Sequence, residues 1–243
     1  MMTRAYGSIG MTVGLLALAA TGAQAQGFAG GTLAVETSAL FEAGEIGHTS
    51  YSGGLQFDVG LGFGLALDLA SYGFSGFGSD GSNATLHAIY GSGPWLGVDG
   101  LALGGFVGRD GFDEGDSEIY GLEVKGWLLG IETESYLARH DGEIGRVNLA
   151  GLNARYEFTP AIFAMGELGF ADGEGELLRG ALGGGYQIDG GPELWGELGR
   201  IKDEDDAFGG DETYLAIGAE IGFGQLSGTT FGTRSLFDVV SGI

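Results

Sequence analysis

The segment T-Y-L-A-I-G-A-E-I-G-F, residues Thr213–Phe223, decides the fold of this chain. Counted back from the terminal phenylalanine, every second residue as far as Leu215 is apolar, and the other positions hold two glycines, a glutamate, an alanine and a tyrosine. A period of two places alternate side chains on opposite faces of a strand. The segment is therefore predicted to form a strand with one apolar and one polar face.

The same alternation recurs along the chain. Most of the runs approach the ~9–11 residues with which a tilted strand crosses the hydrocarbon layer. The run Trp95–Arg109 changes register within itself, which predicts a bulge at Gly104-Gly105 that exchanges its faces. Together the runs number about twelve: Leu33–Phe41, Tyr51–Val59, Phe63–Leu69, Ala84–Tyr90, Trp95–Arg109, Glu118–Leu128, Ile131–Arg139, Val147–Phe158, Ile162–Ala171, Leu177–Ile188, Glu193–Ile201 and Thr213–Phe223.

With its final aromatic residue and its alternate apolar positions, Thr213–Phe223 resembles the closing strand of a Gram-negative outer-membrane β-barrel of the porin-like kind. The resemblance rests on pattern and identifies no individual member. It implies an all-β fold, a single closed antiparallel transmembrane β-barrel of about 12 strands over residues 26–223. It also implies contact with outer-membrane lipid and lipopolysaccharide, and recognition by the barrel-insertion machinery. The alternative is an aqueous β-sandwich with the same alternation.

The connections between the runs differ in length, and this favours the barrel. Tight turns on one side and long polar loops on the other are typical of outer-membrane barrels, in which the tight turns face the periplasm. The predicted short connections are Gly60–Gly62, Gly91–Pro94, Leu129-Gly130, Thr159–Ala161 and Asp189–Pro192. The predicted longer ones are Glu42–Thr49, Ser75–Asn83, Asp110–Ser117, His140–Arg146, Asp172–Glu176 and Lys202–Glu212.

Both ends of the chain lie outside the predicted barrel. Arg4, the apolar run Met11–Ala20 and the small-x-small site Ala23–Ala25 predict a signal peptide over residues 1–25, cleaved on export. At the other end, residues 224–243 are predicted to be a C-terminal periplasmic tail. A loose tail is favoured because termini are usually mobile. Its apolar stretch Ser235–Val240 leaves open a partial plug in the periplasmic mouth.

Composition excludes several classes. The 243 residues carry a formal charge of −23, which disfavours nucleic acid as a partner, and no cysteine. Fifty-three glycines against three prolines fit neither collagen nor a helical protein. Because 44% of the residues are nonetheless hydrophobic, apolar and acidic side chains must occupy separate surfaces.

The candidate functional residues lie on the polar faces of the predicted strands. On strands whose other face meets lipid, charged side chains must point into the lumen, since a charge facing lipid costs ~2–4 kcal/mol at the midplane. Acids outnumber bases there, which predicts a passive channel for small hydrophilic solutes that prefers cations. The competing prediction is a non-conducting structural or surface-interaction barrel. The predicted lumen-facing, pore-lining residues are Glu36, Asp58, Asp68, Glu123, Lys125, Glu132, Glu134, Arg155, Glu157, Glu167, Arg179 and Glu197.

Enzymatic chemistry has one weak signature. His48-Thr49-Ser50 has the H-x-S spacing found in outer-membrane phospholipase A and in lipid A deacylase, and the match goes no further. We therefore assign no catalytic residue and expect no enzyme, with a lipid-modifying barrel as the minor alternative. Acidic loop segments such as Asp110–Asp116 have the spacing of neither an EF-hand nor a β-roll repeat. No metal site and no cofactor are expected, and the oligomeric state stays open.

Overall fold

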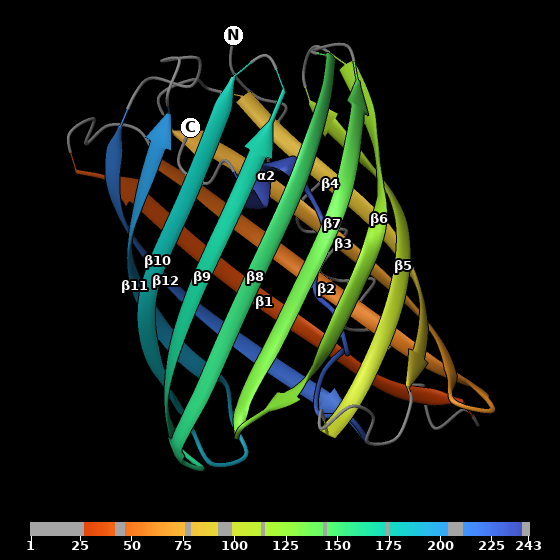
Figure 1. Cartoon of the computed structure of the whole chain (residues 1–243). Helices are drawn as coiled ribbons and strands as arrows, with labels where there is room; N and C mark the ends of the chain where they lie inside the picture. The colour runs from red at the N-terminus through yellow and green to blue at the C-terminus, as the bar shows by residue number, and fades with distance from the viewer. Residues whose placement is uncertain are drawn as a thin grey trace, which may run out of the picture.

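The computed structural model describes residues 27–41, 47–75, 79–91, 99–112, 115–142, 145–173, 175–203 and 211–239, and the predicted signal peptide lies outside them. Twelve antiparallel strands form one closed barrel in which each pairs with its sequence neighbours and the first pairs with the last (Figure 1). The predicted fold is thus confirmed. The strands are β1 (Phe28–Leu40), β2 (Gly47–Gly60), β3 (Phe63–Ser75), β4 (Ser79–Gly91), β5 (Asp99–Phe112), β6 (Gly115–Leu128), β7 (Ile131–Gly142), β8 (Gly145–Thr159), β9 (Ile162–Asp172), β10 (Glu176–Gln187), β11 (Glu193–Asp203) and β12 (Glu212–Gly224).

The alternating pattern separates the two faces of the wall. In β1, Val35 is exposed on the outside while its neighbour Glu36 points into the lumen, where it lines a cavity. In β8, Leu152 and Asn153 show the same opposition. The strand quoted first closes the barrel by pairing with β1, with Ile221 opposite Leu33. The result is a continuous outer band of exposed apolar side chains, the surface that a bilayer covers.

One end of the barrel has very tight turns. Leu61-Gly62 and Leu129-Gly130 are two-residue connections, and all four residues have positive φ, between 55° and 81°. Positive φ at both central positions is the type I′ geometry, whose twist matches that of the paired strands. Glycine takes this conformation at no steric cost, so the second position of each turn is explained. We call this the turn end and the opposite one the loop end.

At the loop end, several connections predicted to be long are mostly strand. Asp110 pairs with Ser117 across β5 and β6, and Asp141 pairs with Arg146 across β7 and β8. Likewise β4 begins within the predicted loop Ser75–Asn83. The pattern of apolar residues ends where the lipid ends, but backbone pairing continues with polar side chains in water. The expected lengths of these loops were therefore wrong. The predicted short link Gly91–Pro94 falls largely on residues 92–98, outside the described ranges.

The predicted bulge in the fifth strand was also misplaced. Pairing runs without interruption through Gly104 and Gly105 on both sides. The register shift lies instead between Asp99 and Ala102, where Gly100 has a φ of 59°. A left-handed glycine absorbs the extra residue there, so that Leu103 faces outward and Phe106 inward.

The C-terminal tail enters the barrel. From the end of β12 at the turn end, the chain turns back and rises through the lumen to a short helix, α2 (Leu236–Val239), near the loop end (Figure 1). Phe231 and Val239 are almost completely buried. The expectation of a loose tail is therefore wrong for residues 225–239, which have apolar and charged partners on the inner wall. No helix in the described ranges is long and apolar enough to cross a membrane.

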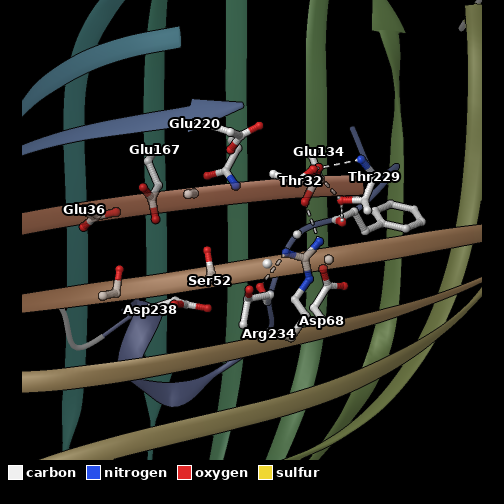
Figure 2. Close-up of a pocket in the computed structure, with 18 of the residues that line it drawn as sticks. Thr32, Glu36, Ser52, Asp68, Glu134, Glu167, Glu220, Thr229, Arg234 and Asp238 are labelled. Atoms are coloured by element: carbon white, nitrogen blue, oxygen red, sulfur yellow. Dashed lines mark hydrogen bonds and ion pairs between the residues drawn. The ribbon is translucent and has the colours of Figure 1, made fainter. Parts of the chain in front are cut away.

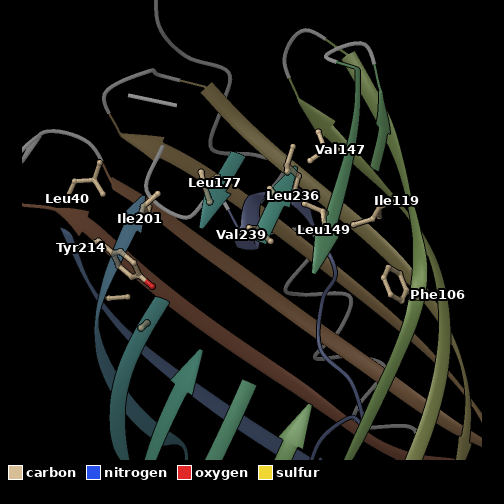
Figure 3. Close-up of a cluster of buried hydrophobic side chains, with 13 residues drawn as sticks. Leu40, Phe106, Ile119, Val147, Leu149, Leu177, Ile201, Tyr214, Leu236 and Val239 are labelled. Carbon is tan, nitrogen blue, oxygen red and sulfur yellow. The ribbon is translucent and has the colours of Figure 1, made fainter. Parts of the chain in front are cut away.

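A buried apolar cluster explains where the tail stops. Leu236 and Val239 pack among side chains that project inward from the wall, as Figure 3 shows. These wall residues stand on the lumen register near the loop end, where the alternation rule predicts polar groups. The wall contributes Leu40, Phe106, Ile119, Val147, Leu149, Ala171, Leu177, Ala181, Ile201, Tyr214 and Ala216.

Candidate functional site in the lumen

The lumen holds a cavity of about 390 Å³ between the inner wall and the tail (Figure 2). Both contribute to it: Glu36 and Glu220 come from the first and last strands, and Thr229, Arg234 and Asp238 come from the tail. Among its lining residues seven are carboxylates and three are Lys or Arg. The cavity is accordingly polar and acidic.

The first ion-pair cluster is built on an arginine of the wall. Arg179 of β10 donates to Glu197 at 2.9 Å and to Glu167 at 3.1 Å, and its Nε donates to the Tyr214 hydroxyl at 2.6 Å. A further bond runs to the backbone carbonyl of Asp238 in the tail. Removing one partner of such a buried cluster leaves an uncompensated charge, so its members hold one another in place.

The second cluster is built on an arginine of the tail. The Nε of Arg234 donates to Glu123 at 3.0 Å, and one terminal nitrogen donates to Glu134. The guanidinium carbon lies 4.7 Å from the ring centre of Tyr136. Only 5% of the Arg234 side chain is exposed. The guanidinium of Arg234 thus ties the tail to two carboxylates of the wall and has almost no access to water that could replace them.

A histidine links this cluster to the nearby strands β3 and β4. His87 of β4 lies between Asp68, 3.0 Å from its Nε2, and Glu123, 2.7 Å from its Nδ1. All three side chains are almost entirely buried. Glu123 is therefore held from both sides, by a wall histidine and by the tail arginine.

Near the loop end the tail is fixed through Asp110 of β5. One carboxylate oxygen accepts from the Ser235 hydroxyl at 2.8 Å, and the other accepts from the Leu236 backbone N–H at 3.0 Å. The second bond gives a partner to the Leu236 backbone N–H, because the first N–H groups of a helix have no partner within it. Asn83 adds a bond to the Arg234 carbonyl at 2.8 Å.

The helix itself carries a titratable group. Asp238 accepts from the Tyr72 hydroxyl at 2.8 Å. Burial raises the pKa of the Asp238 carboxyl to about 7, and the nearby Asp110 adds to the increase, while the Tyr72 hydrogen bond opposes it. Docking of the tail thus depends on a carboxyl that titrates near neutral pH.

Toward the turn end the contacts are neutral. The backbone N–H of Thr229 donates to the Thr32 hydroxyl at 3.1 Å, and that of Thr230 donates to the Gln56 side chain at 2.7 Å. Phe231 packs with Ala66, Ile89 and Ala102 of the wall in a separate apolar cluster. The described tail is therefore attached along the whole lumen.

The predicted lumen residues fall into two groups, and their role in lining a conducting pore stays a prediction. Five do not line the cavity: Asp58 lies at the turn-end mouth, Glu123 lies under Arg234, Glu132 pairs with Lys125, and Arg155 pairs with Glu157. The seven that line it are Glu36, Asp68, Lys125, Glu134, Glu167, Arg179 and Glu197.

The histidine of the H-x-S segment is bonded to the neighbouring strand. The Nδ1 of His48 lies 2.7 Å from the hydroxyl of Ser38 on the neighbouring strand, and its Nε2 lies 3.7 Å from Glu36. Ser50 lines the cavity. His48 and Ser38 are both almost fully buried. Their hydrogen bond is therefore a buried contact that joins β1 and β2.

The apolar stretch Ser235–Val240 was expected, as the open alternative, to form a partial plug at the periplasmic mouth, whereas residues 236–239 lie near the opposite, loop end. Arg234, Phe231 and Asp238 were not candidates, because no alternation places them on a wall. A signal was nevertheless present: apolar residues such as Leu40 and Leu177 occupy the lumen register near the loop end. Such residues need a cover, and the apolar stretch of the tail could have been recognised as that cover.

Comparison with solved structures shows similarity to channel proteins. The KdgM porin matches with a TM-score of 0.56 at 12% identity, covering 78% of this chain and 97% of the porin. The NanC porin matches with a TM-score of 0.54 at 8% identity, covering 77% and 98%. An outer-membrane channel from Pseudomonas putida F1 matches with a TM-score of 0.54 at 14% identity, covering 83% and 97%. No protein-family model matches the chain, and no curated protein matches it in sequence.

At these identities the comparisons establish the fold, which is that of porin-like outer-membrane barrels. The lipid-facing band found above provides the independent physical reason for the same environment. An exposed apolar belt around a closed barrel with no free edges is stable only in a bilayer. The chain is therefore a membrane-spanning β-barrel with the fold of these outer-membrane channels.

Proposed function

We propose that this barrel is a porin-like passive channel for small hydrophilic solutes whose passage is controlled by its own C-terminal tail. The observation that carries the proposal is the acidic cavity of about 390 Å³ that remains beside the tail inside the lumen. A closed structural barrel has no need of hydrated, charged interior space, because burying charge is costly. Twelve strands enclose more room than the eight whose side chains fill their own interior.

Cation preference is the finer part of the proposal. Seven carboxylates line the cavity against three basic side chains, so fixed negative charge remains after every base is paired. Such charge concentrates cations and repels anions. One similar structure is that of the KdgM porin in complex with disordered oligogalacturonate. An acidic oligosaccharide of that kind would be repelled here, and we propose neutral or cationic solutes for this chain.

A non-conducting barrel is the second candidate, and one observation favours it. The apolar cluster that holds Leu236 and Val239 closes part of the lumen at that level of the wall. A seal of this kind would suit a barrel that acts through its surface. It would also suit a channel that opens only when the tail leaves.

Conductance in a planar bilayer distinguishes the two candidates. The full chain and a chain ending at Gly224 are compared after refolding. The channel proposal predicts low conductance for the full chain and a stable, severalfold higher conductance after removal of residues 225–243. If the shortened barrel assembles and does not conduct, the channel proposal is wrong and the non-conducting barrel stands.

The reversal potential in a potassium chloride gradient tests selectivity. At pH 9, where the cavity carboxyls are ionised, Glu36→Gln and Glu220→Gln remove charge from the cavity wall, and Asp189→Asn removes one from a turn outside it. The two cavity substitutions should each lower the cation preference, because fixed charges act within the ~10 Å over which 0.1 M salt screens them. The turn substitution should leave it unchanged. Equal effects from all three would contradict a selective lumen.

A further inference from the structure

The inner wall presents an assembled site around the guanidinium of Arg234. Its members come from three adjacent strands: Phe106 from β5, Glu123 from β6, and Glu134 and Tyr136 from β7. Glu123 and Tyr136 are cross-strand partners, which fixes their separation. We call these four residues the cage.

The geometry of the cage suits a planar cation with several donors. Two different nitrogens of Arg234 bond to two different carboxylates, Glu123 and Glu134. The ring of Tyr136 lies 4.7 Å from the guanidinium carbon, within the range of a cation–π contact. A guanidinium carries spread, in-plane donors and stacks on rings, whereas an ammonium is a compact point charge. The cage therefore matches a guanidinium better than it matches an ammonium.

Each member of the cage has a partner on the wall that does not depend on the tail. Glu123 accepts from His87 at 2.7 Å, and Lys125 lies 3.6 Å from Glu134. The ring of Tyr136 rests on Gly151, where an added Cβ would lie 2.1 Å from the ring. The tip of Phe106 similarly rests on Gly121. The cage is pre-organised by the wall, and the tail only occupies it.

The charged side chains around Arg234 also favour a cation in the cage. Around Arg234 the wall places Glu123, Glu134 and Glu132 together with two basic side chains, Lys125 and His87. When the tail is out of the lumen, this group has more acids than bases and lacks its main counter-charge. A buried site with uncompensated carboxylates attracts a cation strongly.

We propose that the cage is a binding site for guanidinium-bearing solutes, that Arg234 occupies it as an internal competitor, and that solute and tail exclude each other from it. This inference rests on the proposed channel function and names the class of solute that such a channel would select. It gives the tail a second role besides obstruction: an arriving guanidinium weakens the contact that holds the tail at mid-lumen.

Chemical rescue of the full chain tests the site. Arg234→Ala removes the internal guanidinium and leaves the cage empty. Isothermal titration in detergent should then show saturable binding of methylguanidinium, at least tenfold tighter than that of methylammonium. The wild-type chain should not bind at the same concentrations. Adding Glu134→Gln to Arg234→Ala should weaken binding at least tenfold. A folded Arg234→Ala barrel that binds neither cation, or both equally, would overturn the inference.

A second measurement covers the case in which Arg234→Ala does not assemble. Arg234 is the only Lys or Arg after Gly224, so trypsin cleaves the wild-type tail there and only when the tail has left the cage. Methylguanidinium at millimolar concentration should raise this cleavage rate more than methylammonium does. Equal rates would refute competition. Neither measurement requires conductance, so absence of conductance would reject the channel alone, and absence of binding in a conducting barrel would reject the cage alone.

Discussion

Apolar side chains occur on both faces of this barrel wall, and different surroundings cover the two sets. On the outside, residues such as Leu67 and Leu152 are more than 40% exposed in the isolated chain and are covered by lipid. On the inside, residues such as Leu177 and Ile201 are fully buried in the apolar cluster that also holds Leu236 and Val239 of the tail. The outer face needs only a bilayer, while the inner face needs a particular segment of the same chain.

This difference suggests that the tail and the inner cluster depend on each other. Leu236→Asp places a carboxylate among apolar groups that offer it no partner, which costs several kcal/mol. The tail should leave the lumen. Leu226→Asp is the matched control, since Leu226 belongs to the same tail and is exposed. Trypsin cleavage at Arg234 should become fast in the first variant and stay slow in the control. Slow cleavage in both would show that the cluster does not hold the tail.

The two faces should also respond oppositely to one new charge. Leu152 and Asn153 are neighbours on β8: the first faces lipid and the second lines the cavity between the carboxylates of Glu134 and Glu167. Leu152→Arg should cost ~2–4 kcal/mol and greatly reduce the folded yield. Asn153→Arg should assemble normally, because it gains acidic neighbours. Heat-modifiable migration on a gel measures the yield, and similar losses in both would mean that the faces are assigned wrongly.

A smaller effect is expected from pH. Asp238 has a pKa near 7 when the tail is docked and an ordinary, lower pKa when it is released. The docked state therefore binds the proton more tightly, so docking is strengthened as pH falls below about 7 and weakened as pH rises through it. Fluorescence of a probe on the tail should report more release at pH 8 than at pH 6. Asp238→Asn should abolish the difference, and a dependence that persists in this variant would exclude Asp238 as its source.

The wall could be predicted from the sequence, but the contents of the lumen could not. Alternation in β12 and the other strands follows from local physics, because each residue's face is set by its neighbours two positions away. Pairs such as Arg234 with Glu123 join residues 111 positions apart, and no short-range pattern encodes them. The loop-end strands were underestimated for a related reason: residues such as Asp110 pair as strand without the apolar alternation that lipid imposes.

A reversible covalent lock tests the central claim, that the tail controls the lumen, most directly. The chain has no cysteine, so Asp110→Cys combined with Ser235→Cys introduces one possible disulfide, at a contact that measures 2.8 Å between the native side chains. Conductance of the refolded double variant is recorded in one bilayer before and after addition of a reductant. The account predicts low conductance while the disulfide is closed. It predicts a severalfold increase once the disulfide is reduced, because the reduced variant lacks both Asp110 bonds that fix the tail in the wild-type chain. High conductance with the disulfide intact, or none after reduction, would contradict it.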